Sequence, residues 1–212
     1  MSGKPRLLLA TNNAGKAAEL RQLLDGCGWE LVTPKELGLD VDVEESGQSY
    51  AENATMKAVE YAKASGLVAL ADDSGLEVDA LGGRPGVLSA RYAGADRTDW
   101  QRLAALLAEL AGVGDEGRTA RFRAVIAIAD PEGDVELTEG TVEGRIADEP
   151  RGEGGFGYDP VFLLPERGLT MAELPLEKKH AVSHRGEAAR KARKVLERML
   201  GGSGFSPTAA TG

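Results

Sequence analysis

The length, composition and charge of the chain already exclude several classes of protein. Its 212 residues suffice for one compact domain, or one domain with two lobes, whose core needs no cross-links. The formal net charge of −9 disfavours a nucleic-acid or anionic-membrane surface, which normally carries a basic stripe. An anionic substrate would therefore need a few converging cations, backbone N–H groups or a metal ion.

The single cysteine and the lack of long apolar runs indicate the cellular setting. Cys27 has no disulfide partner in the chain, and its place at the end of an apolar helical pattern predicts a buried structural thiol rather than a reactive one. The apolar run after Arg6 is too short for a signal peptide, and no later run approaches the ~18 residues of a membrane helix. We therefore expect a cytoplasmic protein that binds neither membranes nor nucleic acid.

The first predicted unit is a strand, a loop and a helix. Residues 6–10 form an apolar strand, and apolar residues recur at helical spacing over residues 20–27. The loop and the start of the helix contain Thr11, Asn12, Asn13, Ala14, Gly15 and Lys16. A helix N-terminus offers phosphate free N–H groups and a favourable dipole, but a polar turn with a solvated lysine explains this segment taken alone. The P-loop spacing is absent.

A pair of aspartates follows the second predicted helix. This helix spans residues 49–64, begins with capping-box spacing and ends at Ser65-Gly66. A buried strand over residues 67–71 then leads directly to Asp72 and Asp73. Strand C-termini in α/β sheets face the ligand crevice, and carboxylate oxygens there suit Mg²⁺. A turn cap is the structural alternative for this pair.

The acidic loop before the second helix could add a further carboxylate. Glu44 and Glu45 both lie in the loop over residues 40–48. Either side chain could reach the same metal ion as Asp73, although a solvated charge run is the simpler interpretation of the loop alone.

The remaining pattern predicts a β-meander and a final helix. Predicted elements are a strand over residues 29–32, a capped amphipathic helix after Thr98, strands over 118–129, 135–141 and 161–164, and a helix over 185–200. Strands that alternate with helices indicate an α/β fold. Residues 1–200 are therefore expected to form a single domain, and residues 201–212 a flexible tail.

Two later segments add aromatic and cationic groups. The loop over residues 154–160 places Phe156 between glycines, as a loop would if Phe156 stacked on a flat ligand, although a structural turn is an equal alternative. Both histidines of the chain lie among cationic residues just before the final helix, namely Lys178, Lys179, His180, His184 and Arg185. A basic helix start could also explain them.

These motifs together resemble the inosine/xanthosine triphosphate pyrophosphatase family. The shared elements, in order, are Thr-x-Asn-x-x-Lys, Glu-Asn-Ala, Ala-Asp-Asp-Ser-Gly-Leu, Gly-Gly-Phe-Gly-Tyr-Asp-Pro and Ser-His-Arg-Gly, over residues 6–200. The resemblance implies Mg²⁺-dependent hydrolysis of the non-standard purine triphosphates ITP, dITP and XTP to the monophosphate and pyrophosphate. It also implies a homodimer with an elongated mixed β-sheet, flanked by helices, and two lobes around a central active-site cleft.

The resemblance also assigns roles to residues. It implies that Asp73 is the proton acceptor and a metal ligand, and that Glu44 is a second metal ligand. The implied triphosphate loop is Thr11 to Lys16, and the other implied substrate contacts are Asn53, Lys57, Ser74, Phe156, Gly157, Tyr158, Asp159, Lys179, His184 and Arg185. Of these, Phe156 to Asp159 form the base-binding loop.

A mechanism follows as a hypothesis. Mg²⁺ bridges the phosphates, Lys16, Lys57 and the loop N–H groups neutralise the leaving pyrophosphate, and water near Asp73 attacks the α-phosphorus. A free aspartate, with a pKa near ~3.9, is a poor base at neutral pH, so metal polarisation of water is expected to contribute more than Asp73. The alternatives are a non-catalytic nucleotide sensor and a pyrophosphatase of the septum-formation-inhibitor type that acts on pyrimidine or modified nucleotides.

Overall fold

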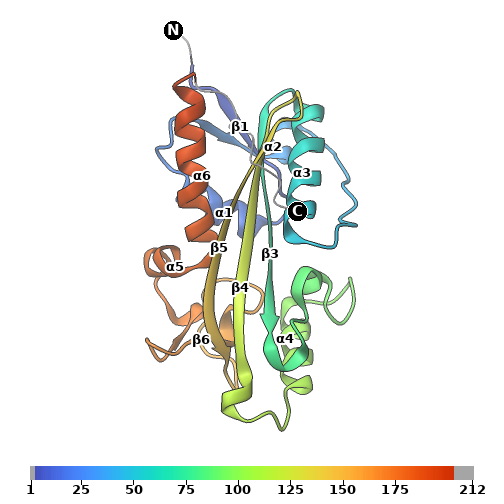
Figure 1. Cartoon of the computed structure of the whole chain (residues 1–212), viewed down its shortest axis with the longest axis vertical. Helices are drawn as coiled ribbons and strands as arrows, with labels where there is room; N and C mark the ends of the chain where they lie inside the picture. The colour runs from blue at the N-terminus through green and yellow to red at the C-terminus, as the bar shows by residue number, and fades with distance from the viewer. Residues whose placement is uncertain (1–2, 203–212) are drawn as a thin grey trace. The chain divides into compact units, whose positions relative to one another are not determined.

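The computed structural model of the protein describes residues 3–202, which form both strands and helices (Figure 1). The strands are β1 (Arg6–Leu9), β2 (Glu30–Val32), β3 (Val68–Val78), β4 (Thr119–Ala129), β5 (Val135–Ile146), β6 (Phe162–Leu164) and β7 (Leu169–Thr170). The α-helices are α1 (Ala14–Leu23), α2 (Pro34–Leu37), α3 (Tyr50–Ser65), α4 (Asp99–Glu109), α5 (Leu176–Val182) and α6 (His184–Leu200).

All seven strands belong to one mixed sheet with the order β2-β1-β3-β4-β5-β6-β7. Strand β1 pairs in parallel with β2 on one side and with β3 on the other, in the register Leu7↔Val68, Leu8↔Ala69 and Leu9↔Leu70. Strands β5, β6 and β7 pair in antiparallel fashion. The predicted α/β fold with a mixed sheet flanked by helices is therefore confirmed.

The described residues divide into two compact units, each made of segments that are separate in the sequence. Unit 1 contains residues 3–73, 124–139 and 187–202, and unit 2 contains residues 74–123 and 140–186. The chain passes from one unit to the other within β3, β4, β5 and α6. The grouping of residues 1–200 as a single domain with two lobes stays a prediction.

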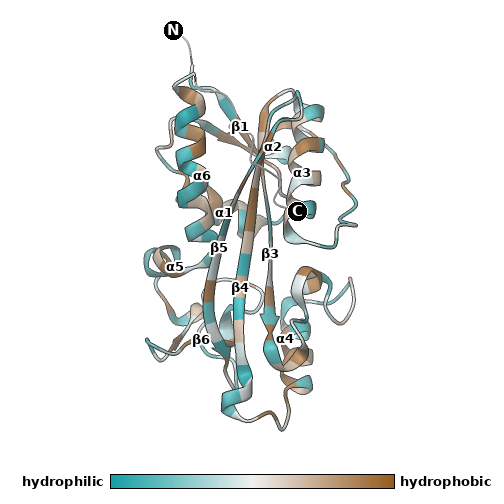
Figure 2. Ribbon diagram, in the orientation of Figure 1, coloured by the Kyte–Doolittle hydropathy of each residue, from teal (hydrophilic) through white to brown (hydrophobic). Residues whose placement is uncertain are grey.

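The core of unit 1 forms on both faces of its strands. Leu7, Leu9 and Leu70 pack with apolar residues of α1 and α6, whereas α3 lies on the opposite side of the sheet (Figure 1). Residues 124–129 of β4 are buried without interruption and appear as an apolar stretch in Figure 2. Such a run is expected for a strand that is covered on both faces. Cys27 belongs to this core and is 3% exposed, so its predicted burial is confirmed.

The core of unit 2 forms around the apolar stripe of α4. Thr98 caps this helix with the predicted capping box, and Leu103, Leu106 and Leu110 are buried against β3 and β4 residues such as Leu76. The predicted end of this strand is wrong: β3 continues through Asp72 to Val78, whereas the sequence pattern predicted a strand over residues 67–71.

The extension of β3 to Val78 has a physical reason. Leu76 and Val78 are fully buried in the core of unit 2, and this burial outweighs the low strand propensity of the aspartates and the glycine before them. Two helices were missed: α2 has only four residues, and α5 covers the cationic segment that the sequence analysis left before the final helix. Of the expected tail, Gly201 and Gly202 form a turn and residues 203–212 lie outside the described part of the chain.

Candidate active site

The loop between β1 and α1 has the structure expected of an anion-binding helix N-terminus. Asn13 is the N-cap of α1, and its side chain accepts a hydrogen bond from the Lys16 N–H at 3.0 Å. Thr11 Oγ1 accepts from the Asn13 N–H at 3.1 Å. Within residues 3–202, the N–H groups of Ala14 and Gly15 have no acceptor, as expected for the first turn of a helix. They remain available to an anion.

Strand alternation sends the side chains of Asp72 and Asp73 to opposite faces of β3. Asp72 has the same parity as Leu70, which packs toward α1, and its carboxylate lies 2.8 Å from Lys16 Nζ of α1. Asp73 faces α3, where Asn53 Nδ2 donates to its Oδ2 at 3.2 Å. The two aspartates therefore point in opposite directions, and they do so within a strand rather than at the strand end that the sequence predicted.

Two lysines from different helices converge on the backbone of Asp72. Lys16 Nζ donates to the Asp72 carbonyl at 3.3 Å, and Lys57 Nζ donates to the same oxygen at 3.0 Å. The ladder between β1 and β3 ends at the pair Leu9↔Leu70, so this stretch of β3 is no longer paired with β1. The two lysines therefore bind the edge of β3 at the point where β3 is no longer paired with β1.

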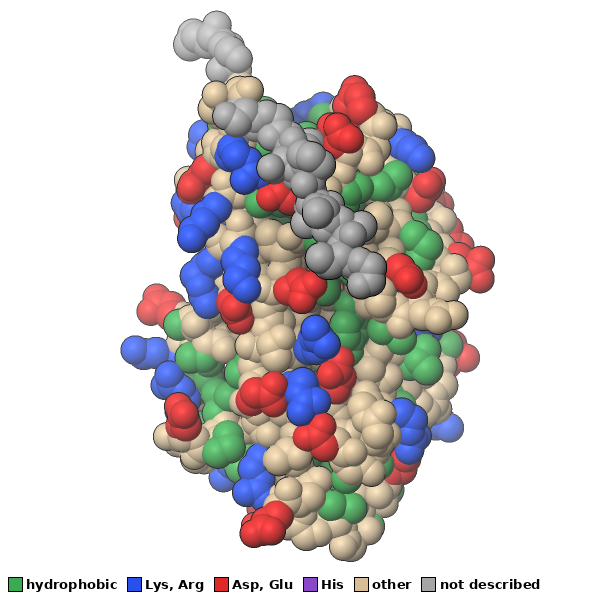
Figure 3. Space-filling view, viewed as in Figure 1, with side chains coloured by type: hydrophobic (Ala, Val, Ile, Leu, Met, Phe, Trp, Pro, Cys, Tyr) green, Lys and Arg blue, Asp and Glu red, His purple; other side chains and the backbone are tan. Residues whose placement is uncertain are grey.

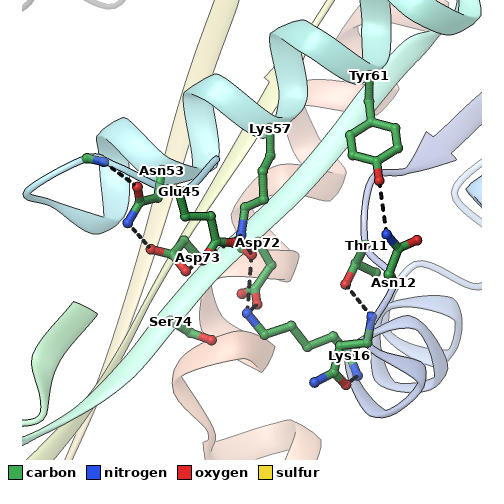
Figure 4. Close-up of polar contacts among 12 residues, drawn as sticks. Thr11, Asn12, Lys16, Glu45, Asn53, Lys57, Tyr61, Asp72, Asp73 and Ser74 are labelled. Carbon is green, nitrogen blue, oxygen red and sulfur yellow. Dashed lines mark hydrogen bonds and ion pairs between the residues drawn. The ribbon is translucent and has the colours of Figure 1, made fainter. Parts of the chain in front are cut away.

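Glu45, rather than Glu44, is the loop carboxylate that reaches this cluster (Figure 4). Its Oε1 accepts a hydrogen bond from Lys57 Nζ at 2.7 Å, and Lys57 Nζ lies 3.6 Å from Asp73 Oδ1. Glu44 is exposed, and its side chain contacts none of these groups. We refer to Lys16, Glu45, Asn53, Lys57, Asp72 and Asp73 as the carboxylate–lysine cluster.

Burial and neighbouring charges raise the pKa values of two members of the cluster, Asp73 and Lys57. Burial raises the pKa of Asp73 above its ordinary value, and this effect, with the neighbouring Glu45 and Asp72 carboxylates, outweighs the attraction of Lys57 and Lys16. Burial alone would lower the pKa of Lys57, but Asp73, Glu45 and Asp72 together raise it. Asp73 is thus a better base than the free aspartate assumed from the sequence, and Lys57 stays charged.

The cluster carries more negative than positive charge, with three carboxylates facing two lysines. Within residues 3–202, no three carboxylate, histidine or cysteine side chains form a group that could hold a metal ion by themselves. Lys57 Nζ lies between the carboxylates of Glu45 and Asp73, so a cation fits this position. Mg²⁺ commonly uses only one or two protein carboxylates and takes its other ligands from water and phosphate oxygens. The residues therefore fit a magnesium ion that is completed by a substrate.

A second cluster lies in unit 2 around the loop that contains Phe156. Asp159 Oδ2 accepts hydrogen bonds from the Phe156 N–H at 2.9 Å and from Lys179 Nζ at 2.6 Å. Lys179 Nζ and Arg185 Cζ lie 5.3 Å and 5.4 Å from the centre of the Phe156 ring. Asp159 therefore holds the loop through hydrogen bonds to its backbone and to Lys179, and two cations lie near the aromatic ring.

Two more groups complete the second cluster. Arg185 donates to Ser74 Oγ at 2.8 Å, and Ser74 follows Asp73 directly in the chain. The His184 ring is stacked on Phe122 of β4, with ring centres 4.7 Å apart and an angle of 15° between the planes. Phe122 belongs to none of the motifs found in the sequence, because an aromatic residue in an alternating strand carries no signal beyond burial.

The predicted site residues thus fall into two groups. Unit 1 brings together Lys16, Asn53, Lys57 and Asp73, with Thr11 to Gly15 beside them, and leaves Glu44 outside. Asn12 is tied to α3, where its side chain donates to the Tyr61 hydroxyl. Unit 2 brings together Ser74, Phe156, Gly157, Tyr158, Asp159, Lys179, His184 and Arg185.

The surface carries both acidic and basic side chains. On the face that Figure 3 shows, acidic and basic side chains are interspersed rather than gathered by sign. None of the helices in residues 3–202 is both long and apolar enough to cross a membrane.

Comparison with known proteins gives one consistent result. The sequence pattern of the Ham1 family matches residues 7–195 of the chain. A dITP/XTP pyrophosphatase of Desulforamulus reducens is 53% identical over 194 residues, which cover 92% of this chain and 96% of the relative. A dITP/XTP pyrophosphatase of Bacillus subtilis is 47% identical over 190 residues, which cover 90% of this chain and 96% of the relative.

A solved structure shares the fold. A HAM1 protein from Coxiella burnetii superimposes with a TM-score of 0.82 at 43% sequence identity, covering 91% of this chain and 98% of that protein.

The raised pKa of Asp73 predicts that Asp73→Asn stabilises the metal-free protein. Because the folded-state pKa lies above the unfolded-state value, ionised Asp73 costs folding free energy at neutral pH, and this cost disappears as the pH falls through the folded-state pKa. We expect the free energy of unfolding to rise by ~0.5–2 kcal/mol at neutral pH, within the range of single stabilising substitutions. Urea unfolding in the presence of a chelator measures this change.

Asp72→Asn provides the contrast, because it removes the fully buried partner of Lys16 and should lower stability. The gain from Asp73→Asn should also shrink on acidification. A stability loss for Asp73→Asn at neutral pH would contradict the dominance of burial at this carboxylate.

Proposed function

Because the chain belongs to the Ham1 family, we propose that it hydrolyses the non-standard purine nucleoside triphosphates ITP, dITP and XTP to the monophosphate and pyrophosphate, and so cleanses the nucleotide pool. The observation that carries the proposal is the buried Asp73 carboxylate beside Lys16, Lys57 and a helix N-terminus with free N–H groups. A binding protein could hold a triphosphate with cations alone, whereas a buried carboxylate with a raised pKa is suited to proton abstraction.

We propose a separate role in substrate binding for each group of residues. The triphosphate binds Lys16, Lys57 and the N–H groups of Ala14 and Gly15, which together supply positive charge and directed donors. The base stacks on Phe156 beside Lys179 and Arg185, and Arg185 also donates a hydrogen bond to Ser74.

Magnesium is proposed as the cofactor, with Asp73 and a loop glutamate as its protein ligands. Glu45 fits this role better than the expected Glu44, because Glu45 shares Lys57 with Asp73. When bound, the ion supplies positive charge against the phosphates and lowers the cost of ionising a nearby water. Lys57 would give up its place between the two carboxylates and turn toward the phosphates.

The protein groups then account for hydrolysis at the α-phosphorus. Asp73 accepts the proton of the attacking water, and its raised pKa suits this role. Asn53 holds the Asp73 carboxylate through Oδ2, which fixes the direction of the other oxygen. Lys16 stabilises the charge that develops on the leaving pyrophosphate.

Selection of a 6-oxo purine is proposed to rest on side chains rather than on the loop backbone. The N–H groups of Phe156 and Gly157 already donate to Asp159 and Asp99. Lys179 and Arg185 also donate, to Asp159 and Ser74, but each side chain carries several N–H groups, so they are the proposed donors for the 6-oxo oxygen, where adenine presents an amino group instead. A buried donor without an acceptor costs about 1–3 kcal/mol, which disfavours ATP.

The resemblance also supports a cytoplasmic homodimer, and this too is a proposal. The chain mass is 22.3 kDa, so we expect light scattering after gel filtration to give twice this value. A monomeric mass at micromolar concentration would contradict the dimer and leave the proposed chemistry untouched.

The proposed substrates can be tested with one panel of nucleotides. We expect pyrophosphate release in the presence of Mg²⁺ from ITP, dITP and XTP, with kcat/KM at least ~100-fold above that for ATP, the size of discrimination that hydrogen-bonding groups can supply. The same panel includes dTTP and UTP.

Each result on this panel has a clear meaning. A preference for dTTP or UTP would favour a pyrophosphatase of the septum-formation-inhibitor type. Binding of ITP without pyrophosphate release from any nucleotide would favour the non-catalytic sensor.

A further inference from the structure

A residue outside all the sequence motifs holds the Phe156 loop. Asp99, the first residue of α4, accepts a hydrogen bond from the Gly157 N–H at 3.0 Å through its Oδ2, across 58 positions of sequence. We propose that Asp99 is a positioning residue for base binding, which fixes the loop that presents Phe156 to a purine. This inference rests on the proposed function and adds a residue that neither the motifs nor the resemblance assigns.

The Asp99 carboxylate is itself held in place before any ligand binds. Its Oδ1 accepts a hydrogen bond from Arg102 at 3.0 Å, and Arg102 also donates to the Ala95 carbonyl at 3.1 Å. The Thr98 capping box fixes the first turn of α4, from which Asp99 projects. A carboxylate anchored at both oxygens is a rigid acceptor, so it restricts the loop rather than following it.

Tyr158, the next residue of the loop, is held by a second hydrogen bond to the protein. Tyr158 is 5% exposed, and its hydroxyl donates to the Ser89 carbonyl at 3.0 Å. Ser89 is in turn fixed, because its hydroxyl donates to the Gly86 carbonyl and accepts from the Leu76 N–H of β3. The Tyr158 hydroxyl thereby ties the loop to Ser89 and, through Ser89, to β3.

Gly157 is the loop residue that most needs such an anchor. Its φ of +62° lies in the left-handed region, and a glycine there has many other accessible conformations. Asp159 fixes the Phe156 N–H, the Asp159 N–H donates to the Phe156 carbonyl at 3.2 Å, and Ser89 fixes the Tyr158 side chain. The bond to Asp99 adds a restraint on the Gly157 N–H from outside the loop. Without it the Phe156 ring loses part of its preorganisation, which a bound base would have to restore.

The test is a comparison of Asp99→Ala with Asp99→Asn. Asp99→Ala removes the acceptor, and we expect the KM for ITP to rise about three- to tenfold, the loss of one partly exposed charged hydrogen bond, with kcat nearly unchanged. Asp99→Asn keeps an oxygen that can accept from the Gly157 N–H, so it should restore most of the affinity. Asp96→Ala is the matched control, because Asp96 is a nearby exposed aspartate of equal charge whose side chain forms no hydrogen bond or ion pair within residues 3–202.

The outcomes separate the inference from the proposed function. If the unmutated protein does not hydrolyse ITP, the proposed function fails. If it does, and Asp99→Ala leaves the KM unchanged or Asp96→Ala raises it equally, the positioning role is overturned. A similar fall in kcat and in melting temperature for both Asp99 variants, without a selective rise in KM, would assign Asp99 to the stability of α4 and would also overturn it.

Discussion

Two consecutive carboxylates on one buried strand are the constraint on which the site depends. The side chain of Asp72 is 0% exposed and that of Asp73 only 8%, so each needs compensating groups that the rest of unit 1 must supply. Strand alternation sends them to different helices: Asp72 is compensated by Lys16 of α1, and Asp73 by Asn53 and Lys57 of α3. Glu45 leaves the cluster short of positive charge, which makes a cation a favourable addition.

The topology of the sheet explains why these segments meet. Because β1 and β3 are parallel neighbours, the loop that follows β1 lies beside the residues that follow Leu70 on β3. The first turn of α1 and the Asp72 carbonyl are thus brought together although 56 positions separate Lys16 from Asp72. Unit 2 builds the proposed base-binding residues on different elements, the Phe156 loop, α5 and the start of α6. The proposed phosphate-binding and base-binding residues therefore belong to different elements of the chain.

Sequence patterns predicted the parts of the structure that depend on local chemistry. The apolar strand before Thr11, the capped helices after Ser49 and Thr98, and the turn after β4 all appear where periodicity and turn residues placed them. The patterns failed where tertiary burial decides: β3 runs on through Asp72 and Asp73, because Leu76 and Val78 are buried further along the strand.

The choice between Glu44 and Glu45 depends on the conformation of an irregular loop, and the bond from Gly157 to Asp99 joins distant segments. Neither leaves a periodic signal in one sequence.

We propose that Asp73 acts as the general base, and its raised pKa indicates that the ionised carboxylate costs stability. The most direct test compares pyrophosphate release from saturating ITP and Mg²⁺ by the unmutated protein and by Asp73→Asn. The account predicts that the folded variant loses at least ~100-fold in kcat, within the range usual for general-base removal, because an amide cannot accept the proton. A folded Asp73→Asn variant with a kcat close to that of the unmutated protein would contradict it.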